Sequence, residues 1–278
     1  MIAPLHDRAE IAAWLRRAAA MHVYALADLD DFFWPNSRWW GWRAGSGDSD
    51  ELRAVALLLQ GFAPPVCYAV APPDDPAMAQ LLAALGSRLP ARSFVNLMCG
   101  GIGHLSGGHL ENAAQFVKMT ISPALAQACP VAADVRLLTP AHLPALEALH
   151  SDVTAADGDQ RFFAPYMLER WPYAGIFSGA ELIAAGGCHV LSETYGVAAI
   201  GNVLTRPDAR GRGLATRISQ TLCTWLAPRA ATIGLNVKAD NAVALRCYSR
   251  IGFREVVRYE EGVLVIPGAA TPAAAQSS

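Results

Sequence analysis

The chain has 278 residues, of which 53% are hydrophobic and 17% are charged, and its formal net charge is −2. This length predicts two domains with sizeable apolar cores. The nearly balanced charge argues against nucleic acid or an anionic membrane as a partner, so we expect a small molecule or a peptide. Six scattered cysteines without Cys-x-x-Cys or metal-ligand spacing favour free thiols in a reducing cytoplasm and no metal.

The first half of the chain predicts helices followed by several strands. The N-terminus has no basic region followed by an apolar core, so we expect a soluble cytoplasmic protein without an export signal. Alanine-rich apolar periodicity predicts one or two helices between Asp7 and Asp31. Strands are expected over 39–44, 52–59, 66–70, 93–98 and 111–121, and a helix over 76–89.

Two segments of this half invite a ligand interpretation. The stretch 34–42 holds four of the seven tryptophans. These rings fit either a ligand slot or packing, and the large apolar area of aromatic side chains favours packing. The glycine-rich stretch 99–108 follows a strand, but it lacks the third glycine of a dinucleotide-binding turn, so we predict a loop.

A Pro- and Ala-rich stretch over 122–134 is expected to link two domains, at 1–125 and 134–267, with a disordered tail over 268–278. The second domain predicts a strand over 135–138 and a helix over about 141–150. A polar loop with Asp152, Asp157, Asp159 and Arg161 follows. A further helix over 162–171, strands over 174–178, 182–191, 196–205 and 232–238, and a helix from Leu214 to before Pro228 complete the pattern.

The turn before Leu214 is typical of a phosphate or pyrophosphate site. Gly211 and Gly213 allow several backbone N–H groups to converge at a helix start, where the helix dipole favours an anion, and Arg210 and Arg212 add positive charge. No lysine follows as in a P-loop, and Thr216 stands where a Rossmann turn needs its third glycine. The predicted phosphate-binding residues are Arg210, Gly211, Arg212, Gly213, Leu214, Ala215 and Thr216.

A second motif lies downstream. Asp240 or Asn241 can cap a helix that Gly252 closes in a left-handed conformation. The spacing Asn241-x-x-Ala-x-x-x-Tyr248-x-x-x-Gly-Phe253, together with Arg-x-x-Gly-x-Ala over 210–215, resembles the acyl-CoA signature of the GCN5-related N-acetyltransferases (GNAT). The resemblance covers 135–266, where a hairpin turned at Glu261 and Gly262 is expected.

The resemblance implies a fold, a cosubstrate and a reaction. The fold is a mixed α/β sheet in tandem acyl-CoA N-acyltransferase-like domains, similar to two-domain glycine N-acyltransferase-like members. The cosubstrate is acetyl-CoA, bound by Asn241, Tyr248, the phosphate turn and backbone groups of Val203, Leu204 and Thr205. The reaction is direct acyl transfer to a primary amine, with Tyr248 as proton donor to the departing thiolate.

The general base stays open. Many relatives have an acidic residue on the strand that ends at Thr205, but here the nearby polar residue is Asn202, whose amide accepts no proton at neutral pH. Glu193, His189, the acids of the 152–159 loop or a water chain are alternatives. A catalytically silent CoA-binding or regulatory module and an O-acyltransferase also fit these motifs.

The first domain is expected to be a degenerate copy of the same fold. Its strand over 66–70 leads into the helix over 76–89, as in the second half, but the connecting loop contains Asp74 and Asp75. Carboxylates in this position repel a pyrophosphate, so we expect no cofactor there.

Overall fold

The structure, a computed structural model, describes residues 1–45, 51–158 and 162–267. The chain divides into two compact units, the first with 1–118, 238–240 and 256 onward, and the second with 119–237 and 241–255. These units are not the contiguous stretches 1–125 and 134–267, because the C-terminal strand runs into the first unit. The expected disordered tail, 268–278, lies outside the described residues.

The sheet of the first unit has the strand order β1 (Ile2–Leu5), β2 (Ser37–Ala44), β3 (Glu51–Leu59), β4 (Val66–Ala69), β5 (Arg92–Met98) and β12 (Arg254–Val265). β1 to β4 pair antiparallel, β4 and β5 pair parallel, and β5 pairs antiparallel with β12. The helices are α1 (Arg8–Arg16), α2 (Val23–Ala27) and α3 (Pro76–Leu85), and β6 (His109–Ile121) leads into the second unit.

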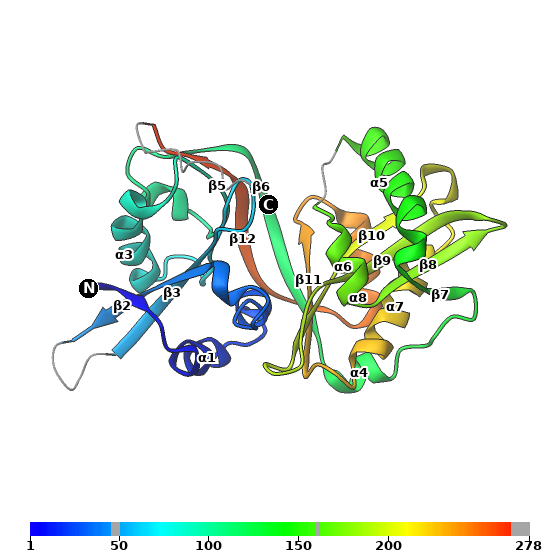
Figure 1. The fold of residues 1–278 in the computed structure, drawn as a ribbon, viewed down its shortest axis with the longest axis horizontal. Coiled ribbons are helices and arrows are strands. Elements are labelled where there is room, and N and C mark those ends of the chain that lie inside the picture. The colour runs from blue at the N-terminus through cyan, green and yellow to red at the C-terminus, as the bar shows by residue number, and fades with distance from the viewer. Residues whose placement is uncertain (46–50, 159–161, 268–278) are drawn as a thin grey trace. The chain divides into compact units, whose positions relative to one another are not determined.

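Helices cover both faces of this sheet (Figure 1). On β3, Ala56 and Leu58 belong to the core that includes Leu81 of α3, whereas Leu57 borders a small cavity with residues of α1 and α2. This division follows from the alternation of side chains along a strand. Trp39 and Trp40 are buried on β2, so this part of the tryptophan-rich segment packs inside the unit as expected.

The sheet of the second unit has the order β11 (Thr232–Lys238), β10 (Val197–Thr205), β9 (Glu181–Ser192), β8 (Tyr173–Ser178) and β7 (Val135–Leu138). β7 to β10 pair antiparallel, and β10 and β11 pair parallel. The helices are α4 (Pro123–Gln127), α5 (Leu143–Asp157), α6 (Pro165–Arg170), α7 (Leu214–Leu226) and α8 (Ala242–Ile251). α5 and α6 share a core with Ala185, whereas the adjacent Gly186 faces Ile218 of α7, so α7 covers the opposite face.

The two units repeat one topology. In each, three antiparallel strand pairs are followed by one parallel pair, helices follow the first strand, and one helix (α3 or α7) connects the two parallel strands. The copies differ after the fifth strand, because α8 follows β11 whereas only a short 3-10 turn, Gly101–His104, follows β5. The mixed α/β fold predicted from the sequence, in two tandem copies, is therefore confirmed.

Several local expectations need correction. The stretch 122–134 is no free linker, since it forms α4 and the carbonyl of Cys129 accepts a hydrogen bond from Thr224 of α7 at 2.7 Å. The hairpin at Glu261 is replaced by one continuous strand, β12, because its residues Tyr259–Val265 pair with β5. α5 continues to Asp157, so Asp152 and Asp157 are helical, while Asp159 and Arg161 lie outside the described residues.

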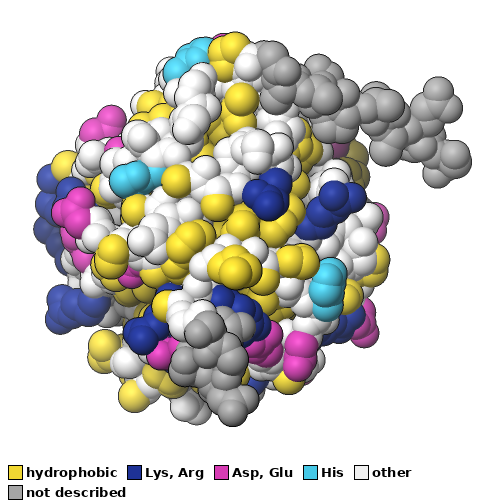
Figure 2. Space-filling view, turned by 90° about the vertical axis from the view of Figure 1, so that its left-hand side faces the viewer, with side chains coloured by type: hydrophobic (Ala, Val, Ile, Leu, Met, Phe, Trp, Pro, Cys, Tyr) yellow, Lys and Arg dark blue, Asp and Glu magenta, His cyan; other side chains and the backbone are white. Residues whose placement is uncertain are grey.

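Figure 2 shows a face on which basic, acidic and apolar side chains are interspersed over the atoms that are not grey. Within the described ranges, no helix is long and apolar enough to cross a membrane. No group of three or more metal-binding side chains is found in this part of the chain.

Candidate functional site

The two parallel strands of the second unit, β10 and β11, part before either of them ends. Their ladder ends at the pair Ile200–Leu235, although β10 continues to Thr205 and β11 to Lys238. The N–H of Arg206 donates to the Ile183 carbonyl of β9. Because successive N–H groups of a strand point to opposite sides, the N–H of Thr205 points away from β9, toward the gap, and that of Leu204 points to β9.

A β-bulge at Asn202 accompanies this parting. The register between β10 and β9 shifts between Gly201 and Leu204, and Asn202 has a φ of 50°, in the left-handed region. Asparagine tolerates this conformation better than most residues, and a bulge bends the strand that carries it. The buried side chain of Asn202 donates hydrogen bonds to the Phe162 carbonyl at 3.1 Å and to the Tyr173 hydroxyl at 3.2 Å. The sequence indicated only that Asn202 stands where an acid is common, and it indicated neither this hydrogen-bonding role nor Tyr173. The one local signal for the bulge is the pair Gly201-Asn202 within a strand, since both residue types tolerate a left-handed backbone.

The phosphate turn lies directly after this end of β10. Gly211 and Gly213 have φ values of 77° and 72°, and a Cβ at either position would have no atom within 4 Å. Gly213 is the N-cap of α7 and provides no side chain to cap the helix. The first N–H groups of α7, from Leu214, Ala215 and Thr216, therefore remain open to an external anion beside an exposed backbone.

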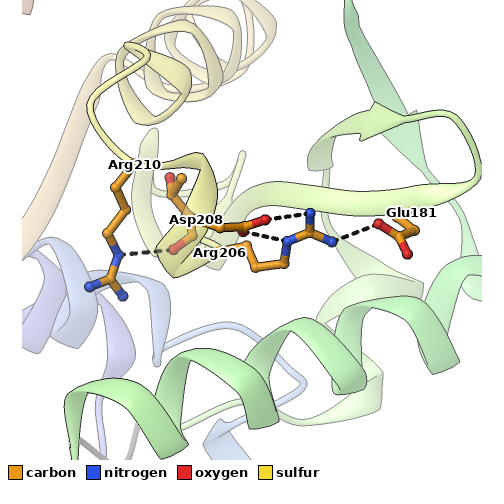
Figure 3. Close-up of polar contacts among 5 residues, drawn as sticks. Glu181, Arg206, Asp208 and Arg210 are labelled. Carbon is orange, nitrogen blue, oxygen red and sulfur yellow. Dashed lines mark hydrogen bonds and ion pairs between the residues drawn. The ribbon is translucent and has the colours of Figure 1, made fainter.

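The arginines around this turn hold the loop as well as carrying charge (Figure 3). Arg206 makes two hydrogen bonds with Asp208, at 2.6 and 2.9 Å, and one with Glu181 at 2.8 Å. These carboxylates raise the pKa of Arg206. Arg210 donates to the Thr205 carbonyl at 3.3 Å and to Asp157 of α5 at 2.8 Å.

Arg210 is therefore partly neutralised by Asp157, a partner that the sequence did not indicate. Its bond to Thr205 connects the phosphate turn to the last residue of β10. Arg212 is exposed, and its charge lowers the pKa of Asp208 after the larger effect of Arg206.

α8 lies beside the first turn of α7. Thr216 Oγ1 and Cys247 Sγ are 3.1 Å apart. Asn241 caps α8 by accepting the N–H of Ala244 at 3.0 Å, and Gly252 ends the helix with a φ of 117°, as expected. Tyr248 is half-buried on α8 and contacts the ring of Phe253 edge-on.

The two candidate bases named by residue lie far apart. Glu193 follows β9 in the turn before Val197, where it pairs with Arg229 at 2.7 Å. At the usual rise of a strand, this end of β10 is roughly 25 Å from Thr205. Glu193 is thus not placed with the other predicted site residues, because the turn that carries it lies at the opposite end of β10.

His189 lies at the bulge. Its imidazole occupies the space that a Cβ at Gly201 would need, and it hydrogen-bonds to the side chain of Asn202. Burial lowers the pKa of His189, and the bond to Asn202 partly opposes that shift. The ring is therefore held neutral near pH 7 at the point where β10 and β11 part.

The corresponding place in the first unit is built differently. The carboxylate of Asp75 caps α3 by accepting the N–H of Met78 at 2.8 Å, and Pro76 at the first helical position has no N–H. β4 ends at Ala69, and its ladder with β5 includes that residue. This helix start is thus closed by the chain's own carboxylate, and the strands do not part within β4.

Residues 143–253 match the model of the Acetyltransferase (GNAT) family. No curated protein matches the sequence. Solved structures similar in fold include a Drosophila protein (15% identity, TM-score 0.70, covering 96% of this chain and 98% of that chain). A second is a GCN5-related N-acetyltransferase from Sphaerobacter thermophilus (17% identity, TM-score 0.55, covering 97% of this chain and 97% of that chain). A third is a tandem GNAT protein from the clavulanic acid biosynthesis pathway (14% identity, TM-score 0.55, covering 97% of this chain and 99% of that chain).

The matched stretch runs from the start of α5 to the residue after Gly252, and so includes the parted strands, the phosphate turn and α8. The similar structures extend over nearly the whole chain and include a tandem protein. Residues 143–253 therefore match the GNAT family, and the chain as a whole has the two-domain, tandem GNAT fold of these structures.

Proposed function

We propose that this chain transfers an acyl group, acetyl in the simplest case, from its CoA thioester to a primary amine on a small molecule or peptide. The observation that carries this proposal is the gap between β10 and β11, which opens next to the uncapped N-terminus of α7. Both features belong to the second unit, so we assign CoA to that unit alone.

The residues fit a CoA thioester. The open backbone from Gly211 to Thr216, with Arg212 beside it, suits the pyrophosphate. The backbone of Val203 and Thr205 faces the gap in which an extended pantetheine arm can pair with strand edges. Asn241 fixes the start of α8 and hence the position of Tyr248.

When bound, the thioester supplies an activated acyl group. Backbone N–H groups at the end of β10, Thr205 foremost, would stabilise negative charge on the acyl oxygen, an effect of about 3 kcal/mol per well-placed donor. Tyr248 is our candidate for the donor of a proton to the sulfur. His189 is our candidate for the proton acceptor from the amine, because it is neutral near pH 7 and lies at the bulge.

The test is release of free CoA thiol from acetyl-CoA, measured with the full chain across panels of amines, amino acids, peptide N-termini and alcohols. We expect release that depends on an amine, and an N-acetylated product by mass spectrometry. Release only with alcohols would replace the amine by a hydroxyl acceptor. CoA binding without release from any acceptor would favour the silent CoA-binding module.

A histidine variant tests the base. His189→Gln should lower kcat/KM by roughly 10²-fold and remove the acidic limb of its pH profile, while CoA affinity changes little. An unchanged pH profile in this variant would exclude His189 as the proton acceptor.

A further inference from the structure

Two thiols of the second unit, outside the proposed acyl-transfer site, lie against each other. Cys129 follows α4, and Cys223 lies in α7. The Cys129 carbonyl accepts a hydrogen bond from Thr224 at 2.7 Å, and the N–H of Ala132 donates to Thr221 at 3.3 Å. These two bonds fix the chain around Cys129 to the turn of α7 that carries Cys223.

The side chains complete this contact. In its thiol form Cys129 donates a hydrogen bond to the Leu125 carbonyl at 3.3 Å, and its sulfur also interacts with the thiol of Cys223. Cys129 is partly exposed, whereas Cys223 is fully buried, and both are free thiols. An oxidant in solution can therefore reach Cys129, whereas Cys223 is shielded from solvent and lies next to Cys129.

The same contact makes the two sulfurs chemically unequal. The hydrogen bond from Cys223 lowers the pKa of Cys129 to about 7, and the bond and burial together raise the pKa of Cys223. Burial raises the pKa of Cys67 and Cys188 to about 12. Cys129 is thus the more acidic of these thiols, and the thiolate is the form that reacts with peroxide.

We propose that Cys129 and Cys223 form a peroxide-responsive modification site that closes into an intramolecular disulfide. The Cys129 thiolate attacks one oxygen of hydrogen peroxide, gives a sulfenic acid and releases hydroxide. The sulfur of Cys223 then displaces the hydroxyl group as water, with its own proton leaving with that water. Two thiols are oxidised by two electrons, and the peroxide is reduced. A dithiol reductant reverses the bond.

This crosslink would join the segment after α4 to the helix whose first turn forms the phosphate site. Residues between the two cysteines include α5, α6 and the strands β7 to β10. Closing a loop of this length restricts the unfolded chain strongly, so the oxidised protein should melt at a higher temperature. The proposal does not depend on the identity of the acyl acceptor.

The first experiment uses the reduced full chain, treated with one to a few equivalents of hydrogen peroxide. We expect intact mass spectrometry to show a species that has lost two hydrogen atoms, and peptide mapping to place the disulfide between Cys129 and Cys223. Cys223→Ala should stop at the sulfenic acid on Cys129, which dimedone traps, and Cys99→Ser should still form the disulfide. Equal oxidation of Cys99 and Cys247, or retention of all six thiols, would overturn the proposal.

The second experiment needs no variant, so it stands even if Cys223→Ala does not fold. The rate of iodoacetamide labelling at each cysteine of the native protein is measured against pH. Cys129 should react at least tenfold faster than Cys99 at pH 7 and titrate near that pH. A Cys129 rate equal to or below that of Cys99 would refute the assignment.

Discussion

At the scale of single residues, Asn202 combines two properties that the site needs. A left-handed backbone conformation lets it form the bulge where β10 leaves β11, and its buried amide ties that bulge to Phe162 and Tyr173. An aspartate in this place would carry a buried charge next to a tyrosine hydroxyl and a carbonyl, which costs several kcal/mol without a cation. The amide of Asn202 therefore suits its buried hydrogen-bond partners better than a carboxylate would.

Gly213 offers a prediction with a matched control. Gly213→Ala should weaken acetyl-CoA affinity more than tenfold, because a side chain is strained at a φ of 72° and would add a methyl group to the open backbone at the start of α7. Gly179→Ala, in the turn between β8 and β9, meets the same strain, since its φ is 61° and nothing lies within 4 Å of its Cβ. Both variants should lose about 1 kcal/mol of stability, and isothermal titration should separate them. Equal CoA affinity in the two variants would contradict the assignment of the phosphate turn.

Tyr248 is tested by removing its hydroxyl alone. Tyr248→Phe keeps the edge-on contact with Phe253, so thermal stability and CoA affinity should change little. Turnover should fall by roughly 10²-fold, the usual effect of losing a positioned acid. Steady-state kinetics with acetyl-CoA and with a thioester of a more acidic thiol complete the test, since the better leaving group should restore most of the rate. Full turnover in the variant would leave Tyr248 a packing residue.

His22 in the first unit predicts a pH dependence of stability. Burial, assisted by the charge of Lys118, lowers its pKa from 6.5 to about 4. At a pH between these two values, His22 is protonated in the unfolded chain but neutral in the folded chain. The contribution of His22 to the free energy of unfolding should therefore fall by about 3 kcal/mol as the pH drops from 6.5 to 4. Burial raises the pKa of Glu261 to about 7, which acts in the opposite direction over this range, so the His22 contribution is read from the difference between wild type and variant.

The measurement is urea unfolding at a series of pH values, followed by the fluorescence of tryptophans such as Trp14, whose ring lies 5.3 Å from that of His22. His22→Gln should lose most of this dependence, whereas His104→Gln, at an exposed histidine, should keep it. Parallel curves for all three proteins would show that other groups control acid stability.

At the scale of elements, the starts of α3 and α7 show how one topology gives two different surfaces. α3 is capped by Asp75 and begins with a proline, so its N-terminal dipole is satisfied within the chain. α7 is preceded by two glycines at positive φ and has no side-chain cap. A carboxylate in the first case and open space in the second explain why we assign an anion to one helix only.

The pair Arg210–Asp157 connects the phosphate turn to α5 and gives a coupling prediction. If Asp157 holds Arg210 in place, Arg210→Ala should weaken CoA binding by about tenfold and Asp157→Asn by a few-fold. The CoA affinity of the double variant should be no lower than that of Arg210→Ala, because both substitutions remove the same Arg210–Asp157 interaction. Thermal stability should change little, since the pair is partly exposed.

The control for this cycle is Arg229→Ala, which breaks an ion pair with Glu193 at the far end of β10. It should leave CoA affinity unchanged in titration calorimetry. Losses that simply add in the double variant would mean that Arg210 and Asp157 act on CoA independently.

At the scale of the whole molecule, the last strand of the chain comes after the second unit in sequence but belongs to the sheet of the first unit. β12 follows α8 of the second unit, yet its residues from Val256 onward belong to the first, where Tyr259–Val265 pair with β5. The contiguous first half of the chain therefore lacks one strand of its own sheet, and the second half carries a strand that pairs in the first unit.

This arrangement predicts how fragments behave. The fragment 131–278 lacks α4 and leaves β12 without its β5 partner, and an unpaired strand of this length associates with other chains. We expect it to elute as high-mass species in size-exclusion chromatography with light scattering. The fragment 119–255, which follows the observed unit, should remain monomeric at the same concentration. A monomeric, soluble 131–278 would mean that the pairing of β12 with β5 is dispensable.

The sequence by itself determined the features that depend on neighbouring residues. The strand–glycine turn–helix unit around Gly213, the cap at Asn241 and the stop at Gly252 follow from local backbone preferences, and their spacing gave the resemblance to the GNAT family. The repetition of one fold in the two halves could also be predicted, because the order of strands and helices follows from local residue patterns. The sequence shows the number of cysteines, but it does not predict which residues lie next to each of them in the fold.

Only the tertiary structure decided the features that join distant parts of the chain. The partner of Arg210 is Asp157, which lies 53 residues away, and Cys129 meets Cys223 across the same unit. The fate of β12 depends on β5, and the role of Asn202 depends on Phe162 and Tyr173. These contacts arise from packing and ladder pairing between distant segments, and local preferences carry no information about which distant segment will be the partner.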